Sequence, residues 1–285
     1  MLANYLIGLR EGLEASLVVV ILVAHLVRTG RSDRLGAVWA GVAAAIAISL
    51  GVGALLTFGP KGLTFQAQEI IGGSLSLIAV ALVTWMVLWM ATAARSLSGE
   101  LKNRLDAAAV VGRRALALVA LLAVGREGLE TALFLWAATR SAATPGQSAA
   151  IPLVGALLGL LTAVVIGWLI YRGALRLNLS RFFAWTGGLL VLIAAGVLAY
   201  AVHDLQEADV LPGLNTLAFD VSTSLAPSTA LATVIKGIFN LSPAMTWLES
   251  LVWVGYVAVV MPLFLQRLRR ANPPQPVPTP TGVRS

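Results

Sequence analysis

Long apolar runs alternate with short polar segments along almost the whole chain. Each run is bounded by charged residues, glycine or proline, and each is long enough for a helix of about 20 residues, the length that spans a hydrocarbon core of about 30 Å. The runs are continuously apolar, unlike the alternating segments of membrane barrels. The pattern therefore predicts an all-α membrane protein with seven transmembrane helices, at about residues 3–27, 35–58, 69–94, 114–139, 150–172, 182–203 and 247–267.

The lysine and arginine residues are distributed unevenly between the two sides of this predicted bundle. Of the 20 basic residues, fifteen fall on one side and only Lys61, Arg140 and Lys236 fall on the other. Basic loops are retained in the cytoplasm, so the bias predicts an N-terminus outside and a C-terminus inside. The same bias explains the net charge of +7, and we therefore expect no nucleic-acid partner.

The hydropathy profile indicates one domain. We expect a single transmembrane domain over residues 1–270, in which residues 204–246 form an outer loop before the last helix, and a proline-rich, disordered cytoplasmic tail over residues 271–285. Part of the outer loop is apolar enough to dip into the membrane, and the sequence leaves open whether it does so.

The two halves of the chain repeat each other. The pentapeptide REGLE occurs at 10–14 and again at 126–130, and Gly72-Gly73 is echoed by Gly187-Gly188 at nearly the same offset. Each unit contains three predicted helices, an odd number, so the two units would cross the membrane in opposite directions, as in the inverted repeats of many transporters. We therefore expect a 3+3 inverted repeat followed by a seventh, C-terminal helix, with repeat one at about 1–95 and repeat two at about 113–203.

Each REGLE motif lies roughly ten residues inside a predicted span, near the middle of the bilayer. An ionised side chain at that depth costs at least about 2.5–3.5 kcal/mol, so the motif needs partners and a function. At 100° per residue, Arg10, Glu14 and Glu11 share one face of a helix, and Gly8, Gly12 and Ser16 form a stripe of small residues that lets another helix pack closely. We expect one side of this helix to pack and the other to present carboxylates.

Symmetry would bring the two acidic faces together. The site would contain the carboxylates of Glu11, Glu14, Glu127 and Glu130, with Arg10 and Arg126 in support. Four carboxylates and two guanidiniums leave a charge of −2 that a metal cation would balance. Oxygen ligands suit hard or borderline ions such as ferric or ferrous iron, manganese, magnesium and calcium.

Other interpretations of the motif stay open at this point. The acids could form salt bridges that only join helices, relay protons, serve a transporter of another divalent metal or of a proton-coupled solute, or act as acid and base in an intramembrane enzyme. The enzyme interpretation is the weakest, because no nucleophile lies near and an enzyme does not need two inverted copies.

Acidic residues at the outer ends of two predicted helices form a candidate entrance site. His203 and Glu207 are four residues apart, Asp204 and Asp209 lie beside them, and Glu69 begins another helix on the same side. The set could collect cations, although a solvated helix end and a dipole-favoured first-turn acid explain these residues equally well.

The paired REGLE motifs in a seven-span, N-out chain resemble the oxidase-dependent iron permeases, a family that includes the fungal high-affinity iron permease and the bacterial EfeU-type permeases. The outer HDLQEAD stretch at 203–209 is also similar to the bacterial members. The resemblance implies that the four REGLE glutamates bind and pass iron, with the two arginines in support. It also implies localisation in the cell membrane, as a bacterial inner-membrane protein.

The resemblance further implies partners outside the membrane. An extracytoplasmic oxidase, a cupredoxin or a peroxidase-like protein would supply the redox chemistry, because no part of this chain resembles such a domain. Cysteine is absent, which excludes thiolate sites and cysteine catalysis. We expect a permease rather than an enzyme, with no cofactor and with iron as the transported substrate, its oxidation state left open.

Overall fold

The computed structural model describes residues 2–93, 103, 105, 107, 108, 110–141, 150–175, 178–220 and 244–271. Seven long helices make up most of these residues: α1 (Leu2–Arg28), α2 (Leu35–Phe58), α3 (Phe65–Ala93), α5 (Arg113–Ser141), α6 (Ala150–Tyr171), α7 (Leu179–Glu207) and α9 (Trp247–Ala271). Each begins and ends within a few residues of a predicted helix, except that α3, α7 and α9 extend up to four residues further. The prediction of an all-α protein is confirmed.

Five of these helices are long and apolar enough to cross a membrane. Their spans are Ser32–Phe58, Phe65–Met90, Ile151–Tyr171, Arg181–Glu207 and Trp247–Arg270. The other two long helices, α1 and α5, contain the charged REGLE motifs. A chain with five such helices requires a bilayer as its solvent.

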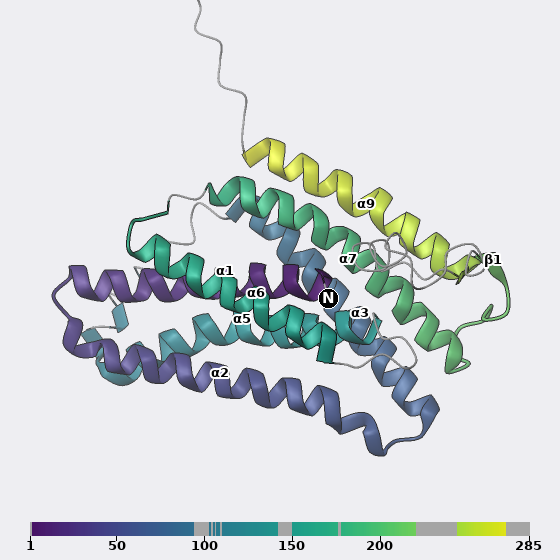
Figure 1. Cartoon of the computed structure of the whole chain (residues 1–285), viewed down its shortest axis with the longest axis horizontal. Coiled ribbons are helices and arrows are strands. Elements are labelled where there is room, and N and C mark those ends of the chain that lie inside the picture. Colours follow the sequence, from purple (N-terminus) through teal and green to yellow (C-terminus); the bar gives the residue numbers. More distant parts are fainter. Residues whose placement is uncertain are drawn as a thin grey trace, which may run out of the picture.

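The helices pair across the two halves of the chain. The most extensive contacts are those of α1 with α6, α2 with α5 and α3 with α7, and α1 also packs on α5. In Figure 1, α9 lies at one edge of the bundle and α2 at the opposite edge. If α1 is matched with α5 as the first helix of each half, and α2 with α6 as the second, the contact of α1 with α6 is equivalent to the contact of α5 with α2.

Small residues make the closest of these contacts possible. A Cβ atom on Gly8 would lie 2.6 Å from the carbonyl oxygen of Ala156 on α6, and one on Gly12 would lie 2.9 Å from the Cβ of Ala163. Ser16, the third member of the stripe, packs on Gly167 of α6. The packing face that the sequence predicts for α1 is therefore the face that lies against α6.

Two apolar clusters hold the bundle together. One joins α1, α3, α5, α7 and α9 through residues such as Ile7, Met86, Phe134, Val191 and Phe264. The other joins α1, α2 and α5 and uses residues further along α1, such as Val18 and Leu22. The carboxylates of α1 and α5 lie at the contact of these two helices, which both clusters share.

The loop before the last helix begins later than its predicted start at residue 204, because α7 continues to Glu207. Within the loop, strand β1 (Leu217–Asp220) pairs antiparallel with β2 (Ala244–Thr246), and β2 leads directly into α9. The Thr246 hydroxyl accepts a hydrogen bond from the Glu249 backbone N–H at 3.2 Å and so caps α9. The part of the loop expected to dip into the membrane and the tail over 272–285 lie outside the described residues.

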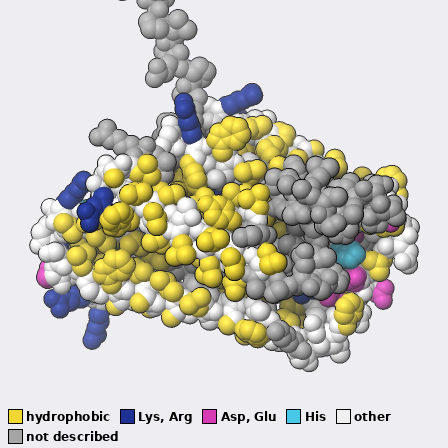
Figure 2. All heavy atoms as spheres, viewed as in Figure 1, with side chains coloured by type: hydrophobic (Ala, Val, Ile, Leu, Met, Phe, Trp, Pro, Cys, Tyr) yellow, Lys and Arg dark blue, Asp and Glu magenta, His cyan; other side chains and the backbone are white. Residues whose placement is uncertain are grey.

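Charge is separated along the molecule. Figure 2 shows lysine and arginine side chains at the left end and along the top, whereas most acidic side chains and the histidine visible in this view gather at the right. We call the end with Glu69, Arg140 and His203 the acidic end, and the end with Arg31, Asp33 and Arg113 the basic end. The described residues thus show the uneven charge expected from the sequence.

Candidate metal centre

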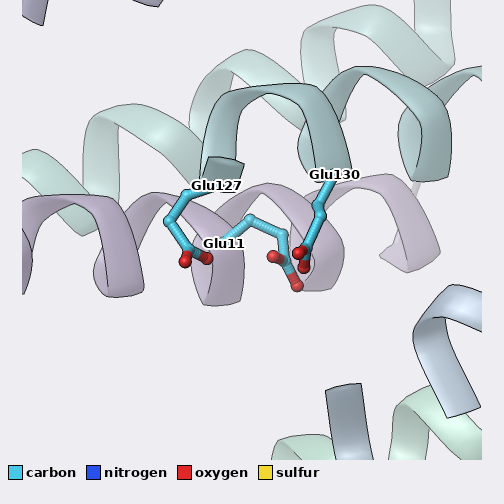
Figure 3. Close-up of side chains that lie close together, drawn as sticks. All are labelled: Glu11, Glu127 and Glu130. Carbon is cyan, nitrogen blue, oxygen red and sulfur yellow. The ribbon is translucent and has the colours of Figure 1, made fainter. Parts of the chain in front are cut away.

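Three carboxylates meet where α1 packs on α5. Oxygen atoms of Glu11, Glu127 and Glu130 all lie within 4.8 Å of one another. Figure 3 shows Glu11 reaching from α1 toward Glu127 and Glu130, which descend from successive turns of α5. We call these three residues the REGLE cluster. Their geometry is that of a group that could share one cation.

The REGLE cluster is mostly buried and incompletely hydrogen-bonded. Glu11 has no exposed surface, and Glu127 is 8% exposed. Both carboxylate oxygens of Glu11, together with Oε2 of Glu127 and Oε2 of Glu130, have no hydrogen-bond partner among the described residues. Buried polar atoms are nearly always satisfied in proteins, so four such oxygens in one place are an arrangement that could bind a cation.

Each arginine of the motif is paired with the second glutamate of its own helix. The Arg10 Nε donates to Glu14 Oε1 at 3.1 Å, and the Arg126 Nε donates to Glu130 Oε1 at 2.9 Å. Arg126 also lies 3.9 Å from a Glu127 oxygen. The two pairs neutralise one carboxylate per motif, and the excess negative charge falls on Glu11 and Glu127 when all four acids are ionised.

Glu14 is therefore placed differently from the other three acids. It lies against Arg10 and is not one of the three carboxylates within 4.8 Å of one another. The two arginines also differ, because Arg10 is buried while Arg126 is 45% exposed and lies over the ring of Trp89 on α3. The two motifs are identical in sequence but not in environment.

The glycine inside each motif packs against the other half of the chain. Gly12 lies against Leu160 and Ala163 of α6, and Gly128 lies against Ser49 of α2. A side chain at either position would separate these helices. Glycine at the centre of REGLE thus lets the helix pack closely on one side while its glutamates face the α1–α5 contact.

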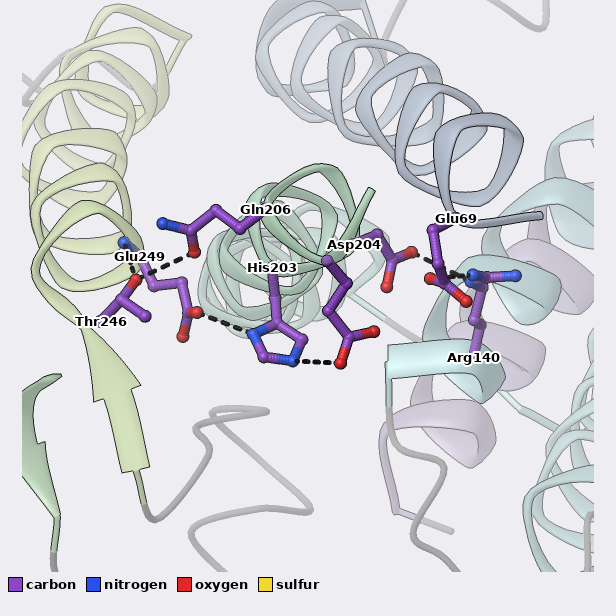
Figure 4. Close-up of polar contacts among 8 residues, drawn as sticks. Glu69, Arg140, His203, Asp204, Gln206, Thr246 and Glu249 are labelled. Carbon is purple, nitrogen blue, oxygen red and sulfur yellow. Dashed lines mark hydrogen bonds and ion pairs between the residues drawn. The ribbon is translucent and has the colours of Figure 1, made fainter. Parts of the chain in front are cut away.

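The residues of the candidate entrance site fall into two groups at the acidic end. Glu69 and Asp204 are both bound by Arg140 of α5, and His203 lies between Glu207 and Glu249. His203 Nδ1 lies 2.9 Å from Glu249 Oε1, and its Nε2 lies 3.4 Å from Glu207 Oε1. Figure 4 shows both groups on either side of α7. Asp209 is exposed in the turn after α7, with φ 57°.

Two partners in these groups are absent from the sequence-based candidates. The sequence predicts Arg140 only as one of three basic residues on its side, and it does not single out Glu249 as a site residue. A single arginine on an acidic face is a signal that could have pointed to an ion pair. The position of Glu249 beside His203 depends on how α9 docks on α7, which no local pattern specifies.

The whole described bundle and its REGLE cluster lie within one family match. The chain matches the model of the Iron permease FTR1 family over residues 1–271, and it belongs to that family. It is therefore an iron permease, a multi-pass transporter of the cell membrane rather than an enzyme, and iron is its substrate.

Curated bacterial proteins are similar over nearly their full length. A ferrous iron permease EfeU of an Escherichia coli strain is 38% identical over 269 residues, covering 93% of this chain and 95% of that protein. The EfeU of Shigella sonnei is 38% identical over 268 residues with the same coverage, and that of Yersinia pestis is 35% identical over 267 residues, covering 93% of both chains. No solved structure matches the chain.

Proposed function

We propose that this permease imports ferrous iron through a carboxylate site formed by Glu11, Glu127 and Glu130. Glu14 is a fourth acid of the site and forms an ion pair with Arg10. The observation that carries the proposal is the group of four buried carboxylate oxygens that lack partners among the described residues. They come from α1 and α5, the first helices of the two halves of the chain. Hard oxygen ligands suit an iron cation.

Charge supports the ferrous ion. The four glutamates and two arginines of the motifs sum to −2 when ionised, so a divalent ion makes the site neutral and a trivalent ion makes it +1. Neutrality matters at this depth because an uncompensated buried charge is costly. The names of the bacterial relatives agree with ferrous iron as substrate.

The direction of transport follows from the proposed topology. The proposed topology has six spans in a 3+3 inverted repeat and α9 as the seventh span. With basic residues retained in the cytoplasm, the acidic end would lie outside and the basic end inside. The equivalent contacts of α1 with α6 and of α5 with α2 support this plan. Iron would pass from the acidic end to the REGLE cluster and then inward, and any oxidase, cupredoxin or peroxidase-like partner would act outside.

Uptake of radiolabelled iron by proteoliposomes tests the proposal. We expect Glu11→Gln to lower ferrous uptake at least about tenfold, because it removes a ligand rather than an outer partner of the metal. Asp33→Asn is the matched control, since Asp33 is exposed at the basic end and pairs only loosely with Arg113 at 3.6 Å. Equal uptake by both variants would overturn the site. Selectivity for iron is tested by adding unlabelled manganese or unlabelled ferrous iron to the same assay. If manganese reduced the uptake of radiolabelled iron as strongly as ferrous iron does, the site would not be selective for iron.

A further inference from the structure

A partly buried ion-pair triad ties three helices together at the acidic end. Arg140 of α5 donates from Nη2 to Glu69 Oε2 of α3 at 2.7 Å and from Nε to Asp204 Oδ2 of α7 at 3.0 Å. Asp204 has no exposed surface, and the Arg140 side chain is only 21% exposed. Figure 4 shows the carboxylates of Glu69 and Asp204 side by side, both facing the guanidinium of Arg140. We call these three residues the Arg140 triad.

The guanidinium fits a space that the backbone of α3 leaves open. It lies directly over Gly72, where a Cβ atom would collide with it. On the next residue, a Cβ atom on Gly73 would lie 3.0 Å from the carbonyl oxygen of Ala201 on α7. Glycine at these two positions thus lets α3 and α7 approach each other and lets Arg140 fill the remaining gap between them and α5.

An apolar section separates the Arg140 triad from the REGLE cluster. The same three helices, with α1, line a small cavity through Ile7, Val83, Phe134, Ala137 and Ile193. Arg140 lies ten positions after Glu130 on α5, about 15 Å along the helix, and the α5 residues of the cavity lie between them. A hydrated cation gains nothing from such a lining, so the way from the acidic end is closed by apolar packing beneath an ion pair.

Among the described residues, the basic end shows no counterpart of the triad. At the offset that relates the two halves, the residues equivalent to Arg140, Glu69 and Asp204 are Ala24, Ala184 and Trp89. The duplicated REGLE motifs are kept in both halves, but the three residues of this tie are not repeated at the equivalent positions. A feature added to one end of a repeated structure fits a function of that end rather than a requirement of the fold.

We propose that Arg140 is the gating residue of the outer entrance, an inference that rests on the proposed path of iron. Its guanidinium forms ion pairs with two carboxylates that would otherwise attract a cation. These ion pairs hold the outer ends of α3, α5 and α7 together. An arriving cation competes with Arg140 for Glu69 and Asp204, whose Oδ1 has no partner among the described residues. Release of Arg140 separates the helix ends and opens the apolar section to water.

The absence of cysteine from the chain makes a direct test possible. Ala137→Cys places one thiol in the lining of the apolar cavity, at a residue that is 1% exposed. A membrane-impermeant, cationic thiol reagent is added to right-side-out and to inside-out vesicles, without iron. We expect slow reaction in the otherwise native chain and a reaction at least about tenfold faster from the acidic end when Arg140→Gln is added, because thiol reactivity depends on access.

Two controls separate gating from loosening of the whole bundle. Arg113→Gln makes the same substitution in an exposed ion pair of the basic end, and we expect it to leave the reaction rate of the Ala137→Cys thiol unchanged. Leu22→Cys places a thiol in the other apolar cluster, at a fully buried residue, and it should stay protected in the Arg140→Gln background. Arg140→Lys keeps the charge but loses the bidentate geometry and should give an intermediate rate at the cavity thiol.

Several results would overturn the inference. Unchanged protection of the cavity thiol in the Arg140→Gln protein would show that the apolar section is closed without the triad, and equal acceleration at both thiols would show a purely structural tie. If Arg140→Gln does not fold, Glu69→Gln removes one arm of the triad and must raise reactivity by itself. Because no iron is present, a failure of the proposed iron site would leave these results unaffected.

Discussion

The glycine at the centre of the first REGLE motif offers a quantitative test of how the site is held. Gly12→Ala adds a Cβ atom that would lie 2.9 Å from the Ala163 Cβ and 3.0 Å from the Leu160 Cδ2. Overpacking of this kind costs about 1–3 kcal/mol. Alanine in a helix is about 1 kcal/mol more stable than glycine. The net destabilisation of Gly12→Ala should therefore be the packing cost minus this gain in helix propensity.

A matched control removes the effect of helix propensity. Gly51 lies within α2 and has nothing within 4 Å of its missing Cβ, so Gly51→Ala should stabilise the protein by about 1 kcal/mol. Unfolding of both variants is measured by denaturant titration in mixed micelles. We expect Gly12→Ala to be the less stable variant by about 1–3 kcal/mol, the packing cost alone. Equal stability of the two would refute the close α1–α6 contact.

The remaining predictions concern ion pairs and a hydrogen bond between helices. Arg10→Gln leaves buried Glu14 unpaired and should lower the free energy of unfolding by about 3–5 kcal/mol. Arg126→Gln removes a half-exposed arginine and should cost clearly less in the same denaturant titration. The reverse order would contradict the burial of the first pair. Tyr256→Phe removes the 2.6 Å hydrogen bond to Thr84 that joins α9 to α3 and should cost about 1 kcal/mol, which an unchanged unfolding midpoint would contradict.

The sequence predicts the helices well because their signal is local. Runs of about 20 apolar residues specify a span without reference to the rest of the chain, and the spacing of Gly8, Gly12 and Ser16 identifies the packing face of α1. The repeat of REGLE also indicates which two helices carry the chemistry. These features are properties of single segments or of their duplication.

The arrangement of side chains around the site is less predictable because it depends on how helices dock. Symmetry suggests four equivalent acids, yet the structure gathers three and places Glu14 against Arg10. The contact of Arg140 with Glu69 and Asp204 joins residues 71 and 64 positions apart. Glu249 meets His203 only because β2 leads α9 back onto α7.

The position of bound iron tests the central claim most directly. Crystals of the permease soaked anaerobically with ferrous ion, with diffraction recorded at the iron absorption edge, locate the metal by its anomalous signal. We predict one peak at the α1–α5 contact, with oxygens of Glu11, Glu127 and Glu130 as ligands at about 2.0–2.2 Å, the metal–oxygen distance typical of carboxylate ligands. A peak elsewhere in the bundle, with these three side chains left without metal, would contradict the account.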